Sequence, residues 1–235
     1  MKVLRFDDLG STQDRAVEIA RDAGDDAWTT VVADRQSKGR GRKGDAWHSP
    51  PGVNLYFSMI ARPPDAFEDA PVVNHAAALA VARALSEHGL ACAIKWPNDV
   101  LVGDRKICGI LSRAGGDDKG GRYIVCGVGL NVNVKDFPPE LSGRATSMLM
   151  ETGRAFDREA VLESVLEALR ERLELLFERG FASQVDDYLS IMAHVGESYV
   201  DAEGEALGEI EGIDRRGRLL VRRGAGSELV AVGRM

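Results

Sequence analysis

The segment from Ala93 to Ser112 reads AIKWPNDVLVGDRKICGILS and contains three short β-prone stretches separated by turns. The stretches are 93–96, 100–102 and 106–112. Pro97 forces an extended or turn conformation, and Gly103 with Asp104 supplies a tight turn. Strands joined so closely pair antiparallel, because a parallel pair needs a crossover of a dozen or more residues. The segment therefore predicts short antiparallel strands within the main domain.

Helices and further strands are predicted on both sides of this segment. Ser11 and Asp14 have capping-box spacing, and Asp157 and Gly180 bracket a long apolar-periodic stretch. The predicted helices are 11–24, 72–89, 158–179 and 181–192, and the predicted strands are 29–33, 53–60 and 123–134. Because the elements do not alternate as βαβ units, we predict an α+β fold with a mixed or antiparallel sheet and flanking helices.

The last forty or so residues have a different texture. Short β-prone stretches at 198–200, 206–213, 219–222 and 228–232 alternate with glycine-containing turns. A unit of this size buries little core by itself, so we expect it to pack on the main domain. We place the division at 1–190 for the main domain and 191–235 for a small β domain.

Composition narrows the class of protein. The chain has 235 residues, of which 44% are hydrophobic and 29% charged, and this is typical of a soluble globular protein. No apolar run reaches the ~18–20 residues needed to cross a bilayer, and the N-terminus has no signal-peptide pattern. Three widely spaced cysteines, in apolar surroundings, indicate reduced core thiols and a cytoplasmic location.

The most basic stretch is the loop from Gln36 to Gly44, QSKGRGRKG. Five of the nine residues from Arg35 to Lys43 are basic, although the chain has a formal charge of −7. Alternate glycines let the backbone approach an anion, and arginine forks suit carboxylate or phosphate. The loop leads into no predicted helix, so it is neither a Walker loop nor a dinucleotide fingerprint. By itself it also fits a solvated loop or a nucleic-acid contact.

The motif KWPND at 95–99 brings a cation, an amide and a carboxylate close together. Lys95, Asn98 and Asp99 could serve nucleotide phosphates and a magnesium ion. The alternative is a strand-ending turn in which Asn98 and Asp99 bond their own backbone.

Two further motifs lie in predicted strands. Lys106 enters a largely apolar strand, where its charge could offset charge that develops in a phosphoryl or acyl transfer. Gly127 and Gly129 interrupt another strand before Asn131, whose amide suits the edge of an adenine. Alone, these motifs fit a solvent-exposed hairpin lysine and a kinked core strand equally well.

Taken in order, these motifs form one set with Ser11-Thr12-Gln13 at its start and Trp47 shortly after the basic loop. The set resembles the biotin–protein ligases, enzymes that attach biotin to a lysine of a biotin carboxyl carrier protein. The resemblance covers nearly the whole chain. It implies the class II synthetase-like catalytic domain of that family and a C-terminal SH3-like β-barrel.

The resemblance implies two overlapping sets of binding residues. The biotin set is Ser11, Thr12, Gln13, Gln36, Gly39, Arg40, Gly41, Arg42, Lys106, Gly109 and Gly127. The ATP set is Arg40, Arg42, Trp47, Lys95, Asn98, Asp99 and Asn131. Lys106 and Arg42 are implied to be catalytic, and no metal ligands are assigned. Gln13 stands where the family commonly has asparagine, and Arg113 stands where many members are acidic.

The implied reaction forms biotinyl-5′-adenylate from biotin and ATP with Mg²⁺ and then transfers biotin to the carrier lysine. A lipoate or octanoate ligase or transferase of the same fold, a nucleic-acid-binding module and a non-catalytic biotin sensor are the alternatives. One branch of the family also represses transcription through an N-terminal DNA-binding domain. Only ten residues precede Ser11, so we expect no DNA binding; no membrane partner is expected, and a homodimer is permitted.

Overall fold

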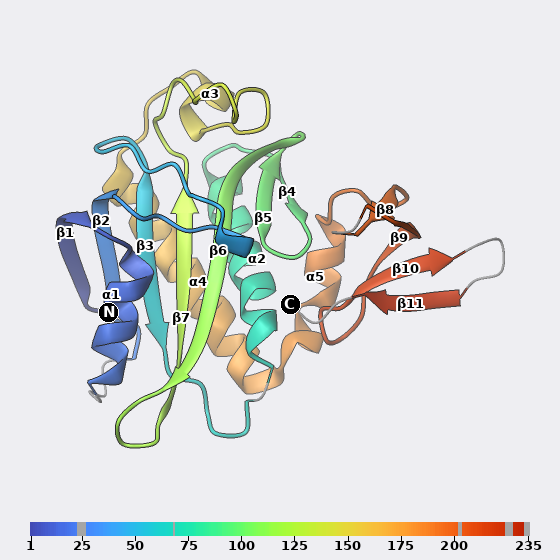
Figure 1. The fold of residues 1–235 in the computed structure, drawn as a ribbon, viewed down its shortest axis with the longest axis horizontal. Coiled ribbons are helices and arrows are strands. Elements are labelled where there is room, and N and C mark those ends of the chain that lie inside the picture. Colours follow the sequence, from blue (N-terminus) through green and yellow to red (C-terminus); the bar gives the residue numbers. More distant parts are fainter. Residues whose placement is uncertain (23–26, 68, 202–203, 224–227, 233–235) are drawn as a thin grey trace.

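The computed structural model describes residues 1–22, 27–67, 69–201, 204–223 and 228–232. Figure 1 shows a large sheet flanked by helices and a smaller sheet formed by the C-terminal strands. The large sheet has seven strands: β1 (Val3–Leu9), β2 (Thr30–Gln36), β3 (Leu55–Ala61), β4 (Cys92–Lys95), β5 (Asp99–Val102), β6 (Arg105–Gly116) and β7 (Arg122–Leu130). The small sheet has four: β8 (Ser198–Val200), β9 (Ala206–Ile213), β10 (Leu219–Arg223) and β11 (Glu228–Val232).

The strand order of the large sheet is β1-β2-β3-β7-β6-β5-β4. Only β1 and β2 pair in parallel, and the other neighbours are antiparallel. The mixed sheet and the antiparallel pairing of β4, β5 and β6 confirm the prediction from the central segment. In this register Asp99 lies opposite both Lys95 and Gly109, so the KWPND turn sits beside the glycine of β6.

Helices cover both faces of this sheet. Helix α1 (Thr12–Arg21) packs on β2, β3 and β7, and its apolar side meets a small core that includes Val31 and Val125. On the opposite face, α2 (Val73–Glu87) packs on the sheet and on α4 (Arg158–Arg179) around the larger core. The remaining helices are α3 (Met148–Thr152), α5 (Val185–Ser190) and the short 3-10 turns η1 (Arg42–Gly44), η2 (Ala70–Val72) and η3 (Phe181–Ser183).

The cap signals of the long helix are confirmed. The Asp157 side chain accepts a hydrogen bond from the backbone N–H of Glu159, and the backbone N–H of Gly180 closes the last turn on Leu176. Ser11 likewise caps α1 by accepting from the backbone N–H of Gln13 at 3.2 Å. Gly24, the expected stop of that helix, lies outside the described residues.

Two elements were not predicted, strand β1 and helix α3. The basic loop contains the three-residue 3-10 turn η1 and then continues to β3, so it leads into no α-helix, as expected. Buried and exposed residues do not alternate regularly along β1, because it is an edge strand and several of its residues are exposed, among them Arg5 and Asp7. α3 has only five residues and is defined by its Ser147 and Gly153 caps.

The C-terminal stretches do form strands, and they pair antiparallel in the order β11-β10-β9-β8. Residues just before them extend the large sheet. The Ile94 N–H donates to the Ile191 carbonyl at 2.7 Å, and the Ala193 N–H donates back to Ile94 at 2.9 Å. The outer edge of β4 is therefore covered by backbone from 191–193.

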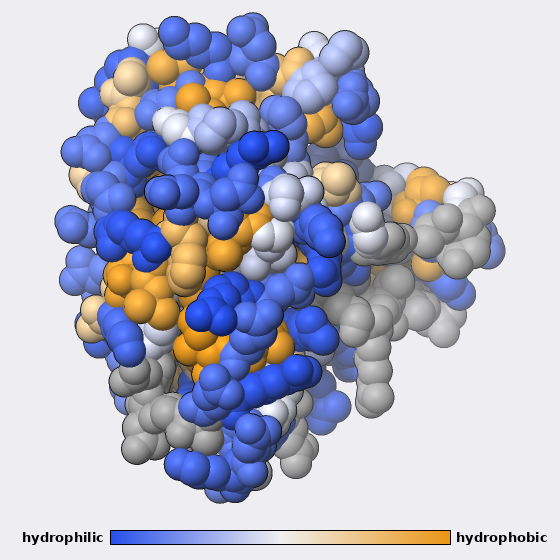
Figure 2. Space-filling model, turned by 60° about the vertical axis from the view of Figure 1, so that its left-hand side comes forward, coloured by the Kyte–Doolittle hydropathy of each residue, from blue (hydrophilic) through white to orange (hydrophobic). Residues whose placement is uncertain are grey.

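The cysteines and the surface are as expected for a globular chain. The cysteines Cys92, Cys108 and Cys126 are free thiols. Within the described ranges, no helix combines the length and the apolar character required to traverse a bilayer. On the side shown in Figure 2, apolar side chains gather in the middle of the face and hydrophilic ones surround them.

Candidate active site

The basic loop folds back on itself beside the large sheet. The Gly41 N–H donates to the Asp45 carbonyl at 2.7 Å, and the Trp47 N–H donates to the Gly39 carbonyl at 3.0 Å. A Cβ on Gly39 would lie 2.8 Å from both the Trp47 carbonyl oxygen and the Ser49 hydroxyl, so no larger residue fits there without movement. The glycines thus allow a tight hairpin that presents Arg42 and Trp47 to the sheet.

One polar cluster, which we call the α1 cluster, joins the start of α1 to β2 and β3. It comprises Thr12, Gln36, Ser49 and Ser58. The Gln36 side-chain oxygen accepts from the Thr12 N–H at 2.9 Å and from its hydroxyl at 3.1 Å, and that hydroxyl lies 2.9 Å from Ser58 Oγ. The Gln36 amide nitrogen donates to Ser49 Oγ at 3.3 Å. Predicted biotin residues from two distant segments therefore meet in one network.

Gln13 extends this region to β6. Its amide nitrogen donates to the Leu111 carbonyl at 2.6 Å and would lie 3.3 Å from a Cβ on Gly127. Gln13 is one methylene longer than the common asparagine, and here it spans from α1 to the strand. A side chain at position 127 would press on this amide, so Gly127 keeps the sheet surface open beneath α1.

A second cluster, which we call the β6 cluster, gathers the predicted ATP-side groups. It comprises Arg42, Trp47, Asn98, Asp99 and Lys106. Arg42 Nη1 donates to Asn98 Oδ1 at 3.3 Å, Lys106 Nζ lies 2.6 Å from Asp99 Oδ1, and the same ammonium lies 5.3 Å from the centre of the Trp47 ring. Two cations, one amide, one carboxylate and an indole from three segments thus converge on the start of β6.

The Trp47 indole lies flat against two glycines on neighbouring strands. A Cβ on Gly129 would be 2.4 Å from Trp47 Cε2, and one on Gly109 would be 2.8 Å from Cζ3. Gly109 and Gly129 are also opposite each other in the β6–β7 register. Together they form a flat backbone surface that accepts the ring, and any side chain there would displace it.

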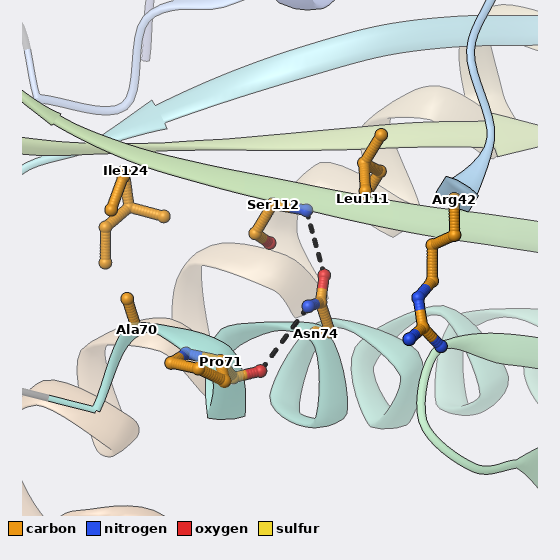
Figure 3. A pocket seen from close by; sticks show the side chains of 8 residues that line it. Arg42, Ala70, Pro71, Asn74, Leu111, Ser112 and Ile124 are labelled. Atoms are coloured by element: carbon orange, nitrogen blue, oxygen red, sulfur yellow. Dashed lines mark hydrogen bonds between the residues drawn. The ribbon is translucent and has the colours of Figure 1, made fainter. Parts of the chain in front are cut away.

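A small cavity opens beside Arg42. It measures about 220 Å³, below the ~300–1,000 Å³ usual for drug-sized ligands. Its lining is Arg42, Ala70, Pro71, Asn74, Leu111, Ser112, Ala114 and Ile124. Figure 3 shows Arg42 extending from η1 towards α2 and Asn74 hydrogen-bonded to the Ser112 N–H, at 2.9 Å. The cavity can hold part of a ligand that Arg42 contacts, but not a whole nucleotide.

Three predicted site residues lie apart from these clusters. The Arg40 guanidinium pairs with Asp14 on α1, and Lys95 is exposed on β4. Asn131 is buried: its amide nitrogen donates to the Thr146 carbonyl at 3.0 Å, and its oxygen accepts from Asn54 at 3.3 Å. Its side chain is therefore committed largely to the fold between β7 and the segment that precedes α3.

Sequence reasoning missed four residues of this region. Ser49 accepts from Gln36 in the α1 cluster, and no motif singled it out. Ser58 is fully buried in the α1 cluster, and a polar residue in the mostly apolar run VNLYFSMI was the available signal. Gly129 supports Trp47, and the repeated glycine in GVGLN pointed to it. Asp14 pairs with Arg40, but the sequence assigned its carboxylate to the helix cap.

Two thiols and one imidazole behind the site are neutral at pH 7. Burial raises the pKa of Cys126 to about 12 and that of Cys108 well above its usual range, so neither thiol is a ready nucleophile. Burial also lowers the pKa of His75, on α2, to about 4. Within the described ranges no group of three or more His, Cys, Asp or Glu side chains could hold a metal ion.

Comparison with known proteins places this geometry in a family. The model of the biotin/lipoate A/B protein ligase family matches residues 9–131. The chain is 35% identical over 231 residues to the biotin–[acetyl-CoA-carboxylase] ligase of Paracoccus denitrificans, covering 94% of each chain. It is 34% identical over 229 residues to the bifunctional ligase/repressor BirA of Bacillus subtilis, covering 95% of this chain and 70% of that one.

A solved structure agrees over the whole length. The biotin protein ligase of Aquifex aeolicus in complex with biotin and ATP superposes with a TM-score of 0.85 at 32% identity, covering 99% of this chain and 96% of that one. The fold resemblance therefore includes the C-terminal sheet as well as the region that carries both clusters. The family match, the relatives and the fold agree, and the chain belongs to the biotin/lipoate A/B protein ligase family.

Proposed function

We propose that this chain is an ATP-dependent biotin–protein ligase. It activates biotin as biotinyl-5′-adenylate and transfers it to a lysine of the biotin carboxyl carrier protein of a carboxylase. The observation that carries the proposal is the β6 cluster, in which Arg42, Lys106 and the KWPND turn converge beside the α1 cluster. Relatives that are ligases by name, at 35% and 29% identity, support this substrate pair.

The chemical difficulty of the first step is that two anions must approach each other. A biotin carboxylate oxygen attacks the α-phosphorus of ATP, the bond to the β-phosphate oxygen breaks, and pyrophosphate leaves. Arg42 and Lys106 carry the positive charges that offset this repulsion, and they are held in place before the substrates arrive by Asn98 and Asp99. Both cations are therefore proposed to be catalytic.

In the second step the uncharged amine of the carrier lysine attacks the activated carbonyl. An amide bond forms, the bond between the carbonyl carbon and the phosphate oxygen breaks, and the amine gives up one proton to water. AMP leaves with the phosphate charge still beside Lys106. The adenylate is reactive towards water, so the site must exclude it until the carrier docks. We infer that the basic loop orders further over the ligand for this reason.

For biotin, we propose that the α1 cluster holds the polar ring and that Gly109 and Gly127 leave room for it on the sheet. Thr12 and Gln36 already share two hydrogen bonds, which fix both side chains beside the start of α1 before a ligand binds. Ser11, Gln13, Gly39 and Gly41 are assigned to shaping this pocket. They cap α1, bridge to β6 and fold the loop.

For ATP, we propose that the adenine packs on Trp47. The Trp47 indole nitrogen is buried and makes no hydrogen bond to the described residues, so it has an unused donor. Asn98 and Asp99 are assigned to the phosphates, with exposed Lys95 at the outer side. Asn131 is assigned to the adenine side through the segment it holds at Thr146.

Mg²⁺ is proposed to accompany ATP. The Asp99 carboxylate is 26% exposed and offers the oxygen ligand that Mg²⁺ prefers, and a single carboxylate is sufficient when phosphates supply other ligands. When bound, the ion would add positive charge at the phosphates. Asp99 would then be shared between the ion and Lys106.

We also propose that the C-terminal sheet is the SH3-like barrel of the family, in a small domain from about residue 191. The four antiparallel strands support this assignment. The chain is further proposed to act in the cytoplasm without binding DNA, which the free thiols and the formal charge of −7 support. A homodimer is proposed as compatible with the position of β1, which is the edge strand of the large sheet among the described residues.

Transfer of labelled biotin to a carrier domain tests the function. The native chain with biotin, ATP and Mg²⁺ is expected to label the carrier and release pyrophosphate. Arg42→Ala and Lys106→Ala should each reduce adenylate formation by about a hundredfold or more, the scale of removing one preorganised charge stabiliser. Labelling with lipoate instead of biotin, or no pyrophosphate release at all, would overturn the proposal.

A further inference from the structure

One carboxylate beside the loop belongs to neither cluster. Asp14 lies in the first turn of α1. Its Oδ2 pairs with Nη2 of Arg40 in the loop, and its Oδ1 lies 3.9 Å from Nη1 of Arg113 on β6. A single negative charge is thus placed between two guanidinium groups from different segments.

Because of Asp14, the side chains of the two loop arginines lie in different places. Arg42 points to Asn98 in the β6 cluster, whereas Arg40 is held at the outer surface by Asp14. The side chains of Arg40 and Asp14 are 49% and 38% exposed. The two loop arginines therefore tie the loop to different elements, Arg40 to α1 and Arg42 to the KWPND turn.

Arg113 makes the loop position depend on the charge of Asp14. With the carboxylate present, both guanidinium groups have an opposite charge between them. Without it, Arg40 would face Arg113 across the same gap, and like charges would favour a loop that moves away. The residue at 113, which departs from the acidic residue implied by the resemblance, has a defined contact here.

We propose that Asp14 is a positioning residue that holds the loop over the pocket through Arg40 before any ligand binds. The consequence for catalysis rests on the proposed function, but the loop contact itself does not. A partly exposed ion pair shifts such an equilibrium only modestly. We expect loss of the Asp14 charge to raise the open fraction of the loop about two- to fivefold.

The first experiment uses the full chain without ligands. Trypsin cleavage after Lys38, Arg40, Arg42 and Lys43 is followed by mass spectrometry of the loop fragments. Asp14→Asn should be cut about two- to fivefold faster than the native chain. Added salt should accelerate cleavage of the native loop and have less effect on the variant, because salt screens the pair.

A matched control lies on the same helix. Glu18 pairs with Arg15 at 2.9 Å, and this pair also lies at the surface of α1 but does not involve the loop. Glu18→Gln should leave loop cleavage unchanged. Equal cleavage of Asp14→Asn, Glu18→Gln and the native chain would overturn the proposal.

A second variant tests whether the charge, and not local structure, matters. Asp14→Asn combined with Arg113→Glu returns a carboxylate to the same gap and should restore slow cleavage. In an Arg113→Ala chain, Asp14→Asn should accelerate loop cleavage less than it does in the native chain, because the repelling charge is gone. Failure of the double variant to recover any protection would contradict the electrostatic account.

A catalytic measurement then distinguishes this inference from the proposed function. Asp14→Asn should raise the KM for biotin about two- to fivefold with little change in kcat, since Arg42 and Lys106 remain in place. A chain that shows the cleavage effect but no biotin transfer would keep the loop contact and refute the proposed function. A chain that transfers biotin without any cleavage effect would refute the role of Asp14 alone.

Discussion

Replacing Gly129 by alanine adds one methyl group where the Trp47 indole already lies against β7. The added Cβ would be 2.4 Å from Cε2, 2.5 Å from Nε1 and 2.8 Å from Cζ2 of the ring. Carbon atoms that are not bonded rest about 3.5–4.0 Å apart, so the ring must withdraw by roughly 1–1.5 Å. The backbone of Gly129 is not left-handed, so the methyl group itself, and not strand strain, is the perturbation.

The expected cost follows from the surroundings of the ring. Overpacking of this kind usually costs about 1–3 kcal/mol. Trp47 belongs to a loop, so the ring can move. We therefore expect most of this free energy to displace the loop and little of it to destabilise the sheet. If Trp47 supports the adenine, kcat/KM for ATP should fall about tenfold to a hundredfold, while the KM for biotin changes little.

The assay is pyrophosphate release at varied ATP with saturating biotin. Gly116→Ala on β6 is the control, because its nearest neighbour would be the Gly121 carbonyl at 3.8 Å, an ordinary contact. In a Trp47→Phe chain, which has a smaller ring at this position, Gly129→Ala should reduce kcat/KM for ATP clearly less. Equal kcat/KM for Gly129→Ala and Gly116→Ala would refute the packing argument.

Three further predictions concern stability. Burial lowers the pKa of His75 from 6.5 to about 4. Between these pH values the unfolded chain binds a proton that the folded chain does not, so urea unfolding should show a loss of roughly 3 kcal/mol between pH 7 and pH 4 that His75→Phe lacks. Trp96→Phe removes the 2.9 Å hydrogen bond from Nε1 to the Gly217 carbonyl and should lower the urea-derived free energy of unfolding by about 1 kcal/mol. Asn74→Ala leaves the Ser112 N–H of β6 without its acceptor and should cost about 1–3 kcal/mol by thermal unfolding, whereas Asn74→Asp, which keeps an acceptor, should cost less.

Local signals predicted most of the fold. The caps at Asp157 and Gly180 define α4, and the Gly103-Asp104 turn fixes the pairing of β5 with β6. Strand β1 could not be predicted in the same way, because its parallel pairing with β2 is non-local and its exposed charges hide the alternation. The barrel closure of the C-terminal sheet also remains a prediction.

The candidate site was predictable as a set of residues but not as a geometry. The motifs indicated that Arg42, Asn98 and Lys106 belong together, and the sheet register brings them there. The sequence could not show that Arg40 turns away to Asp14, because that contact depends on how α1 lies against the loop. In the sequence Arg40 and Arg42 look equivalent, and only the fold shows that they bind different partners.

The backbone bridge between β4 and residues 191–193 has a practical consequence. A division of the chain at residue 190 would remove Ile191 and Ala193 and leave the N–H and C=O groups of Ile94 without partners on the outer edge of the sheet. Bare sheet edges recruit strands from other molecules. A shortened enzyme that ends before 191 should therefore precipitate or self-associate, whereas one that ends after Ala193 should keep this edge closed.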